Sequence, residues 1–299
     1  MIEITNVSKS YDDIKAIDGI NLTIREGAVF GLVGTNGAGK STLLRMITGI
    51  LRNDEGSITI DGLNVYENID AKNRFFYISD EQFFPQNATP VSMAEFYSSM
   101  YASFDMDRFT ELIAKFNLVR SRRVATFSKG MKKQLSILLG ICAGTKYLIC
   151  DETFDGLDPV MRQAVKSMFA AEMVDRDFTP IIASHNLREL EDICDHVGLL
   201  HRGGVLLSKD LADMKENIHK IQCVLKEGQT RDAFKGLDIL NIETRGSLYT
   251  VTARGLREDI LNYVQQSDPL FVEALPLSLE EIFISETGGV GYDIKKILF

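Results

Sequence analysis

The sequence predicts an α/β domain, in which helices pack against a largely parallel sheet, followed by a small α+β domain. Up to about residue 210, short strand-like runs alternate with helical patterns. After that point the texture changes to strand-like segments separated by helical stretches. We therefore expect an N-terminal domain over residues 1–212 and a small accessory domain over residues 213–299.

Four continuously apolar runs are expected to form the buried strands of the first domain, because strands covered on both faces do not alternate. These runs are Ala28 to Val33, Phe75 to Ser79, Tyr147 to Cys150 and Pro180 to Ser184. The earlier runs 2–8 and 20–24 alternate polar and apolar residues, which predicts a half-exposed antiparallel sheet. Residues of about 88–142 show helical patterns without convincing strands, so we expect an inserted helical lobe there.

The accessory domain shows strand-like segments around residues 218–225, 238–241, 248–253 and 270–274. With the helical stretches between them, they fit the order β-α-β-β-α-β of a ferredoxin-like unit. A final segment begins at Ser278 and carries a helical apolar stripe of Leu279, Ile282 and Phe283. A packing face against its own domain is favoured for this stripe, while a dimer contact or a regulatory role stays open.

The composition, with 45% hydrophobic and 25% charged residues in a chain of 299, is that of a globular protein. A formal charge of -9 argues against nucleic acid as a partner, because phosphate backbones attract an excess of Lys and Arg. We expect a cytoplasmic protein, since no apolar run is long enough to span a membrane and the amino terminus does not resemble a signal peptide. The widely spaced Cys142, Cys150, Cys194 and Cys223 are expected to be reduced thiols.

The stretch "GTNGAGKST", directly after the run that ends at Val33, satisfies the pattern G-x-x-x-x-G-K-[ST]. The glycines allow backbone N–H groups to surround phosphate oxygens, the lysine neutralises their charge, and the serine hydroxyl can bind Mg²⁺. A nucleoside triphosphate site is strongly favoured over a structural turn. The residues assigned to it are Gly34, Asn36, Gly37, Ala38, Gly39, Lys40, Ser41 and Thr42.

Polar side chains follow two other buried strands, at the sheet edge where α/β proteins bind ligands. Asp151 is placed to hold Mg²⁺, and Glu152 to polarise a water that attacks the γ-phosphate. His185 is placed to contact the γ-phosphate or that water. A solvated turn for the two acids, and a structural role for the histidine, are the alternatives.

Ser128 and Gly130 in "FSKGM" stand where a run of helical apolar spacing begins. A helix start attracts anions, because its free N–H groups and its dipole favour negative charge. A serine at this place is equally what an ordinary helix uses as its N-cap.

Together these segments resemble the ATP-binding subunit of ABC transporters over nearly all of residues 1 to about 210. "FSKGM" resembles the family's signature loop, usually written LSGGQ, with Ser128 and Gly130 retained. "FDGLDP" resembles the loop after the catalytic glutamate, with Asp158 in its acidic position, and Tyr11 corresponds to the aromatic residue that stacks on adenine. The segment from Ser278 resembles the ending of ATP-binding subunits of bacterial drug, peptide or lantibiotic exporters.

This resemblance implies a head-to-tail homodimer in which one subunit's phosphate loop and the other's signature loop hold each ATP. Binding and hydrolysis of ATP with Mg²⁺ would close and open the dimer and drive separate membrane-spanning subunits. The chain would then lie on the inner face of the cell membrane as a peripheral subunit of an exporter.

One departure concerns the loop after residues 75–79, where the family carries a glutamine that ligates Mg²⁺. Counting places Asp80 there and Gln82 two residues later. We assign Asp80 to the metal, with Gln82 as the alternative if the loop shifts. Phe83, Phe84 and Pro85 fit either a groove for a membrane subunit or the core.

Two other classes compete with the transporter interpretation. A soluble ABC ATPase acting on a non-transport partner generally carries two ATP-binding domains or a long coiled coil, whereas this chain shows one phosphate loop and no sustained heptads. A P-loop kinase or GTPase is disfavoured by "FSKGM", by the series Asp151, Glu152 and His185, and by the lack of a guanine-binding motif at a strand end.

Overall fold

The computed structural model describes residues 1–288, so the last part of the predicted accessory domain, 289–299, lies outside the described residues. The chain divides into two compact units, Met1–Ser208 and a second unit from Lys209 onward. The division falls four residues before the expected boundary at 212 because α8 (Leu211–Asn217) packs against the first strand of the second unit.

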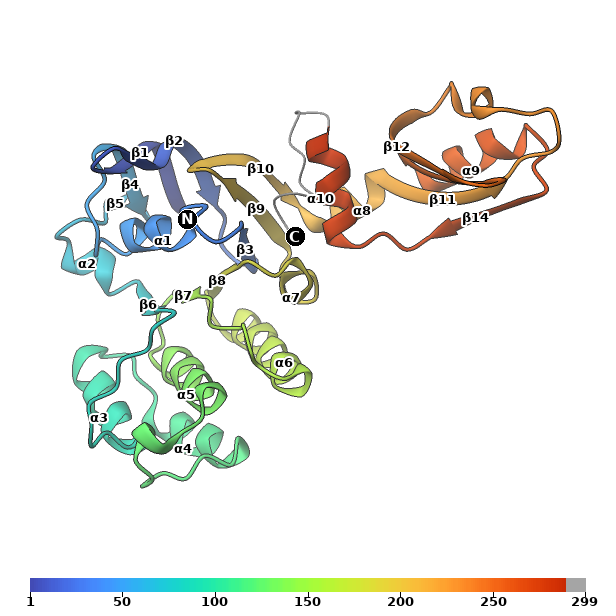
Figure 1. Cartoon of the computed structure of the whole chain (residues 1–299). Coiled ribbons are helices and arrows are strands. Elements are labelled where there is room, and N and C mark those ends of the chain that lie inside the picture. Colours follow the sequence, from blue (N-terminus) through green and yellow to red (C-terminus); the bar gives the residue numbers. More distant parts are fainter. Residues whose placement is uncertain (289–299) are drawn as a thin grey trace. The chain divides into compact units, whose positions relative to one another are not determined.

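The first unit contains two sheets (Figure 1). The antiparallel sheet has the order β2-β1-β4-β5, with strands β1 (Ile2–Tyr11), β2 (Ile14–Ile24), β4 (Glu55–Ile60) and β5 (Leu63–Asn64). The larger sheet has the order β10-β9-β3-β8-β7-β6, with strands β3 (Phe30–Val33), β6 (Phe75–Ile78), β7 (Tyr147–Asp151), β8 (Thr179–Ser184), β9 (His196–His201) and β10 (Gly204–Asp210).

The larger sheet is parallel in the pairings β3 with β8, β3 with β9, β6 with β7 and β7 with β8. All six residues of β8 and all five of β7 are buried, as expected for strands covered on both faces. The parallel arrangement brings the carboxyl ends of β3, β6, β7 and β8 to one edge of the sheet. The residues that directly follow these strands in the sequence therefore lie at this edge.

The main core cluster lies between the two sheets and includes α1 (Lys40–Ile47). Ile2, Ile24 and Ile60 come from the antiparallel sheet, and Phe30 and Ile149 from the parallel one, and all are buried. The alternation of the early strands therefore reflects a sheet with one face on this core. The helix α2 (Ile69–Lys72) lies beside β5.

The inserted helices gather at one end of the first unit (Figure 1). They are α3 (Pro90–Met100), α4 (Met106–Lys115), the short 3₁₀ helix η1 (Val124–Thr126) and α5 (Lys129–Cys142). Thr89 and Ser92 form a reciprocal capping box at the start of α3, and Asp105 caps α4. Two further helices, α6 (Pro159–Asp175) and α7 (Leu187–Glu191), follow β7 and β8.

The second unit is an antiparallel sheet of order β12-β13-β11-β14. Its elements are β11 (Ile218–Val224), η2 (Arg231–Phe234), β12 (Asp238–Arg245), β13 (Leu248–Arg254), α9 (Arg257–Gln265), β14 (Phe271–Leu275) and α10 (Leu279–Gly288). Between β11 and β12, where a helical stretch was expected, the chain forms only the one-turn helix η2. Ile221, Phe234, Val251 and Val264 are among the buried residues of the core of this unit.

The predicted α/β architecture, with an antiparallel sheet and inserted helices, is confirmed. All four cysteines are buried free thiols. Burial raises the pKa of Cys223 to about 11 and that of Cys142 to about 12, which keeps these thiols protonated at neutral pH. Within residues 1–288, no helix is both long enough and apolar enough to cross a lipid bilayer.

Candidate functional site

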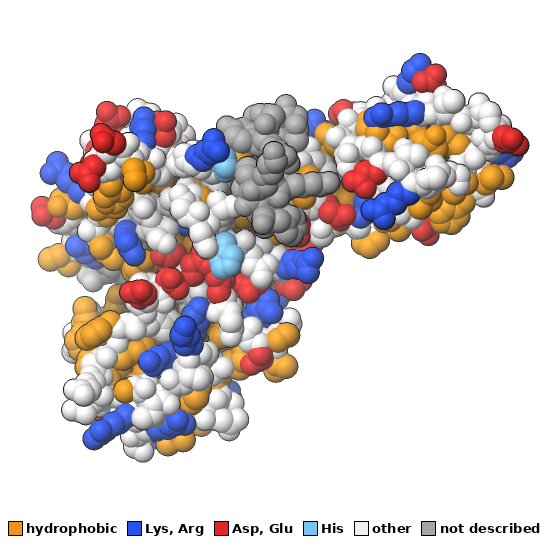
Figure 2. Space-filling model, in the orientation of Figure 1, with side chains coloured by type: hydrophobic (Ala, Val, Ile, Leu, Met, Phe, Trp, Pro, Cys, Tyr) orange, Lys and Arg blue, Asp and Glu red, His pale blue; other side chains and the backbone are white. Residues whose placement is uncertain are grey.

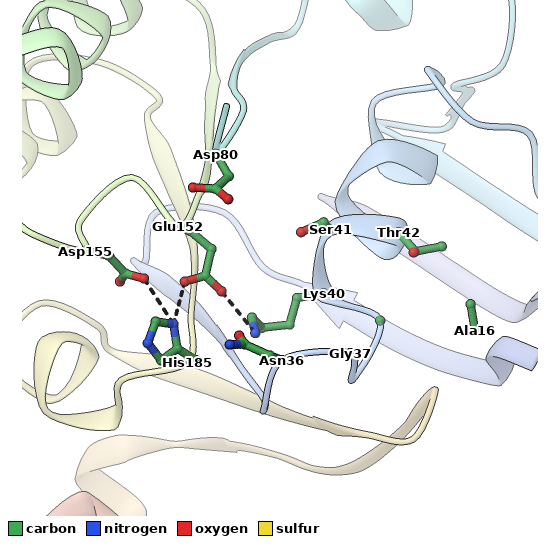
Figure 3. Close-up of a pocket in the computed structure, with 11 residues that line it drawn as sticks. Ala16, Asn36, Gly37, Lys40, Ser41, Thr42, Asp80, Glu152, Asp155 and His185 are labelled. Atoms are coloured by element: carbon green, nitrogen blue, oxygen red, sulfur yellow. Dashed lines mark hydrogen bonds and ion pairs between the residues drawn. The ribbon is translucent and has the colours of Figure 1, made fainter. Parts of the chain in front are cut away.

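A pocket of about 500 Å³ lies where the parallel strands end. Its walls come from the loop after β3 and the start of α1, from residues that follow β6, β7 and β8, and from Ala16 in β2. In Figure 2, acidic side chains gather beside a histidine on the visible face of the first unit. The pocket residues are Ala16, Asn36, Gly37, Gly39, Lys40, Ser41, Thr42, Asp80, Glu152, Asp155 and His185 (Figure 3).

The loop before α1 has the backbone that its glycines were expected to provide. Gly37 and Gly39 have φ angles of 80° and 103°, in the region that favours glycine. A Cβ at Gly34 would lie 2.5 Å from the carbonyl oxygen of Leu200, so only glycine fits against that strand. Ala38 is buried and does not line the pocket, although the sequence assigned it to the phosphates along with Gly34.

Lys40, the first residue of α1, directs its ammonium group into the pocket (Figure 3). Its Nζ lies 2.7 Å from the carbonyl oxygen of Gly34, 3.2 Å from that of Thr35 and 3.1 Å from Oε1 of Glu152. The residue is only 5% exposed. A buried ammonium ion that is held by carbonyl oxygens is oriented to receive an anion from the pocket side.

Ser41 and Asp151 form an oxygen-rich pair beneath the loop. Ser41 Oγ donates to Asp151 Oδ1 over 3.1 Å, and the hydroxyl of Tyr77 donates to Oδ2 over 3.2 Å. Burial raises the pKa of Asp151, the charges of Glu152 and Asp80 raise it further, and the two hydroxyl hydrogen bonds oppose the shift. A buried carboxylate among other acids is stabilised by a cation, and its oxygen neighbours suit a hard one such as Mg²⁺.

Glu152 lies between Lys40 and His185 and contacts both of them. Its Oε1 contacts Lys40, while its Oε2 lies 2.7 Å from Nδ1 of His185 (Figure 3). Asp155 Oδ2 lies 3.1 Å from the same histidine nitrogen. The hydrogen bond to Glu152 and the charge of Asp155 raise the pKa of His185, against the opposing effects of burial and of the positive charge of Lys40. The histidine is therefore held in a negative environment that favours its protonated form.

Several predicted site residues do not line this pocket: Asp151 lies beneath it, Gly34, Ala38 and Tyr11 are absent from its lining, and so are Ser128, Gly130 and Asp158. Ser128 caps α5, its hydroxyl accepting from the N–H of Met131 over 3.2 Å, and Asp158 caps α6 in the same way from Met161 over 2.9 Å. Gly130 lies in the first turn of α5. Within one chain, therefore, the serine and the aspartate act as ordinary N-caps.

Of the remaining predicted residues, some line the pocket and others do not. Asp80 lines the pocket, whereas Gln82 lines a neighbouring one with Phe83 and Phe84. Among the described residues, the Nε2 atom of Gln82 is buried without a hydrogen-bond partner. Tyr11 is 45% exposed at the end of β1 and does not line the pocket. Its role at the adenine stays a prediction.

Sequence reasoning missed Asp155, Tyr77 and Ala16 as parts of this site. Asp155 stands three residues after Glu152, so the loop "DETFDGLDP" carried a visible signal for it. Tyr77 lies inside an apolar strand, and only the pairing of β6 with β7 places its hydroxyl on Asp151. Ala16 comes from a distant strand and offers no chemical signal in the sequence.

Comparisons with known proteins agree with this geometry. The model of the ABC transporter domain matches residues 17–155. The ABC transporter ATP-binding protein YtrB of Bacillus subtilis is 31% identical over 289 residues, which cover 97% of this chain and 99% of YtrB. The bacitracin transport ATP-binding protein BcrA of Bacillus licheniformis is 28% identical over 303 residues, with 97% of this chain and 98% of BcrA covered.

A solved structure of an ATP-binding subunit of an ABC transporter superposes with a TM-score of 0.66. It is 25% identical and covers 72% of this chain and 92% of its own. The resemblance that the motifs indicate is confirmed, and so is the fold class. With its phosphate loop, its paired acids and a relative matched over nearly the full length of both chains, this chain belongs to the ATP-binding proteins of the ABC transporter family.

Proposed function

We propose that the protein hydrolyses ATP, with Glu152 as the base that polarises the attacking water and His185 as the residue that contacts the γ-phosphate or that water. Family membership implies ATPase activity, and the proposal rests on the place of Glu152 between Lys40 and His185. A carboxylate beside the phosphate-binding lysine can reach a water in line with a bound γ-phosphate. The hydrogen bond to His185 orients that carboxylate.

The cofactor of this reaction is MgATP. Ser41 and Asp151 offer hydroxyl and carboxylate oxygens 3.1 Å apart, and Asp80 lines the pocket together with Ser41. This donor set fits Mg²⁺, which prefers oxygen ligands and is usually held by one or two carboxylates together with substrate phosphates. When bound, the ion would neutralise charge on the phosphates. The chain's own groups orient the nucleotide, because the N–H groups of the loop, Lys40 and Thr42 hold its phosphates.

The functional unit is a head-to-tail homodimer. Ser128, Gly130 and Asp158 resemble family residues that complete an ATP site, yet they do not line the pocket of their own chain. A second copy that places the start of α5 over this pocket would supply the missing donors, because free N–H groups at a helix start bind anions. Each ATP would then join two subunits, and hydrolysis would release them.

The partners are membrane-spanning subunits encoded as separate chains, and the protein is a peripheral subunit on the inner face of the cell membrane. BcrA is named as a bacitracin transport ATP-binding protein and matches over nearly its full length, which supports a role in transport, and export is the direction that we propose. Nucleic acid is not a partner, given the net charge of -9. Residues 213–299 act as a separate accessory domain of ferredoxin-like connectivity.

The substitution Glu152→Gln tests this function. The variant keeps the shape of the side chain but loses the base, so we expect ATP binding, very slow hydrolysis and accumulation of a dimer with ATP. Size-exclusion chromatography with MgATP and a phosphate-release assay give the two readouts. Glu111→Gln on the exposed face of α4 is the matched control and should behave as wild type. A Glu152→Gln protein that stays monomeric and turns over normally would contradict the proposal.

A further inference from the structure

The loop that carries Glu152 is attached to the helix that begins at Ser128 within the same chain. Lys133, in the second turn of α5, donates from its ammonium group to the carbonyl oxygens of Glu152 over 2.6 Å and Asp155 over 2.7 Å. A Cβ added to Gly130 would lie 4.0 Å from the carbonyl oxygen of Gly156. The first turns of α5 thus lie directly against residues 152–156.

The backbone at Glu152 needs such support. Its φ angle is +50°, a left-handed conformation that costs a non-glycine residue on the order of 1 kcal/mol or more. Its N–H donates to the carbonyl oxygen of Ala183 over 3.0 Å, which fixes one side of the residue to β8. The other side, the carbonyl, is fixed by Lys133. Hydrogen bonds from a charged donor are stronger than those between neutral groups, so the ammonium is well suited to hold a strained turn.

Lys133 does not reach the pocket itself. Both of its hydrogen bonds go to main-chain oxygens, whereas the carboxylate of Glu152 points the other way, toward Lys40 and His185. Any effect of Lys133 on the chemistry must therefore pass through the position of the backbone.

We propose that Lys133 is a positioning residue for ATP hydrolysis, which sets the backbone of Glu152 from the helix whose first residues meet the partner's ATP. The inference rests on the proposed function, in which Glu152 is the base and the start of α5 binds in trans. Movement of α5 on dimer closure would then be passed to the glutamate of the same chain by two hydrogen bonds. A misplacement of about 1 Å at a catalytic group can cost up to about 10²-fold in rate.

The test compares three variants of the full-length protein. Lys133→Met keeps the apolar stem but removes the donors, Lys133→Arg keeps a charged donor, and Lys115→Met removes the same charge from an exposed position at the end of α4. For each we would measure ATP affinity, kcat and KM for hydrolysis, the thermal midpoint, and hydrogen exchange of peptides that cover 152–158 and 34–42.

Lys133→Met should lower kcat by about tenfold or more, with KM and ATP affinity unchanged within about twofold, because only the geometry of the base is lost. Exchange should rise in residues 152–158 and stay constant in the phosphate loop. Lys133→Arg should restore at least part of kcat, and Lys115→Met should match wild type.

Wild-type kcat and exchange in Lys133→Met would overturn the inference. So would a loss of ATP affinity and thermal midpoint in parallel with kcat, since that pattern marks a general structural role. These outcomes differ from failure of the proposed function, in which the wild-type protein does not hydrolyse ATP and Glu152→Gln forms no dimer. If the proposed function fails in this way, the proposed role of Lys133 in hydrolysis is refuted as well.

Discussion

The carboxylate of Glu152 and the imidazole of His185 are hydrogen-bonded, with 2.7 Å between Oε2 and Nδ1. Asp155 approaches the same nitrogen to 3.1 Å, so the histidine faces two acids that follow one strand. The hydrogen bond to Glu152 is the main reason that the pKa of His185 lies above its usual value of 6.5, and the charge of Asp155 adds to the shift. This arrangement makes the protonation of His185 dependent on its neighbours.

Replacing Asp155 by Asn should therefore lower the pKa of His185 toward its usual value, because one negative charge is lost while a hydrogen-bond acceptor for Ser184 remains. NMR titration of the imidazole protons, assigned with His185→Gln, measures this shift. Asp175→Asn at the far end of α6 serves as the control and should leave the titration unchanged. An unaltered pKa in Asp155→Asn would show that its charge does not act on the histidine.

The same shift predicts a pH dependence of stability. A group whose pKa is raised on folding stabilises the folded protein fully below its unfolded pKa of about 6.5, and this contribution is lost as pH rises through the folded value. The difference in unfolding free energy between wild type and His185→Gln should therefore shrink above that range. Urea unfolding curves at several pH values test the trend, and a difference that grows with pH would contradict it.

Lys40→Ala should abolish tight ATP binding. The ammonium group is held at the pocket by Gly34 and Thr35, and among the described residues no other lysine lines that pocket. Calorimetric titration with MgATP measures the affinity, and circular dichroism checks the fold. Lys166→Ala on the exposed face of α6 is the control for loss of one positive charge. Retained affinity in Lys40→Ala would remove the phosphate-loop assignment.

Ser128→Arg should block ATP-dependent dimerisation and leave ATP binding by the monomer intact. Ser128 is outside the pocket of its own chain, so a bulky cation there should disturb only a contact with a second copy. The change also removes an N-cap, which costs about 1 kcal/mol of stability. Ser128→Asp keeps the cap and adds a negative charge. If both variants fail to dimerise, the loss is caused by the disturbed contact with the second copy and not by a less stable helix.

Sedimentation of both variants in the Glu152→Gln background, with and without MgATP, gives the result. Ser167→Arg, at an exposed position on α6, is the control for an added arginine. Loss of ATP binding by monomeric Ser128→Arg would mean that α5 serves the site of its own chain.

The metal assignment predicts opposite outcomes for two neighbouring residues. Asp80 lines the pocket, and its charge already raises the pKa of Asp151. Asp80→Ala should increase the Mg²⁺ concentration needed for half-maximal hydrolysis, because one oxygen ligand is removed. Gln82→Ala should leave that concentration within about twofold of wild type. The reverse order would show that the loop shifts and that Gln82 enters the site.

The phosphate loop and the acids at the end of β7 could be predicted from the sequence because each is a local pattern with a local cause. Gly37 and Gly39 stand where the backbone must adopt positive φ, and Lys40 follows at the first position of the helix. The buried strands were equally visible, because continuous apolar runs are typical of strands that are covered on both faces. The segment between β11 and β12 shows the limit: a helical stretch was expected, and only the one-turn helix η2 forms, since short helical patterns contribute little free energy on their own.

By itself the sequence determined the family, the phosphate loop, the buried strands and the pair Asp151 and Glu152, because these depend on residue type at fixed spacing. Only the tertiary structure decided that Asp155 faces His185, that Tyr77 holds Asp151, and that Lys133 holds the backbone of Glu152. These contacts join elements that are distant in the chain, or they involve the turn after β7, and no sequence pattern predicts which way the side chains of that turn point. They exist because parallel pairing brings the ends of β6, β7 and β8 to one edge, and packing then determines which side chains meet there.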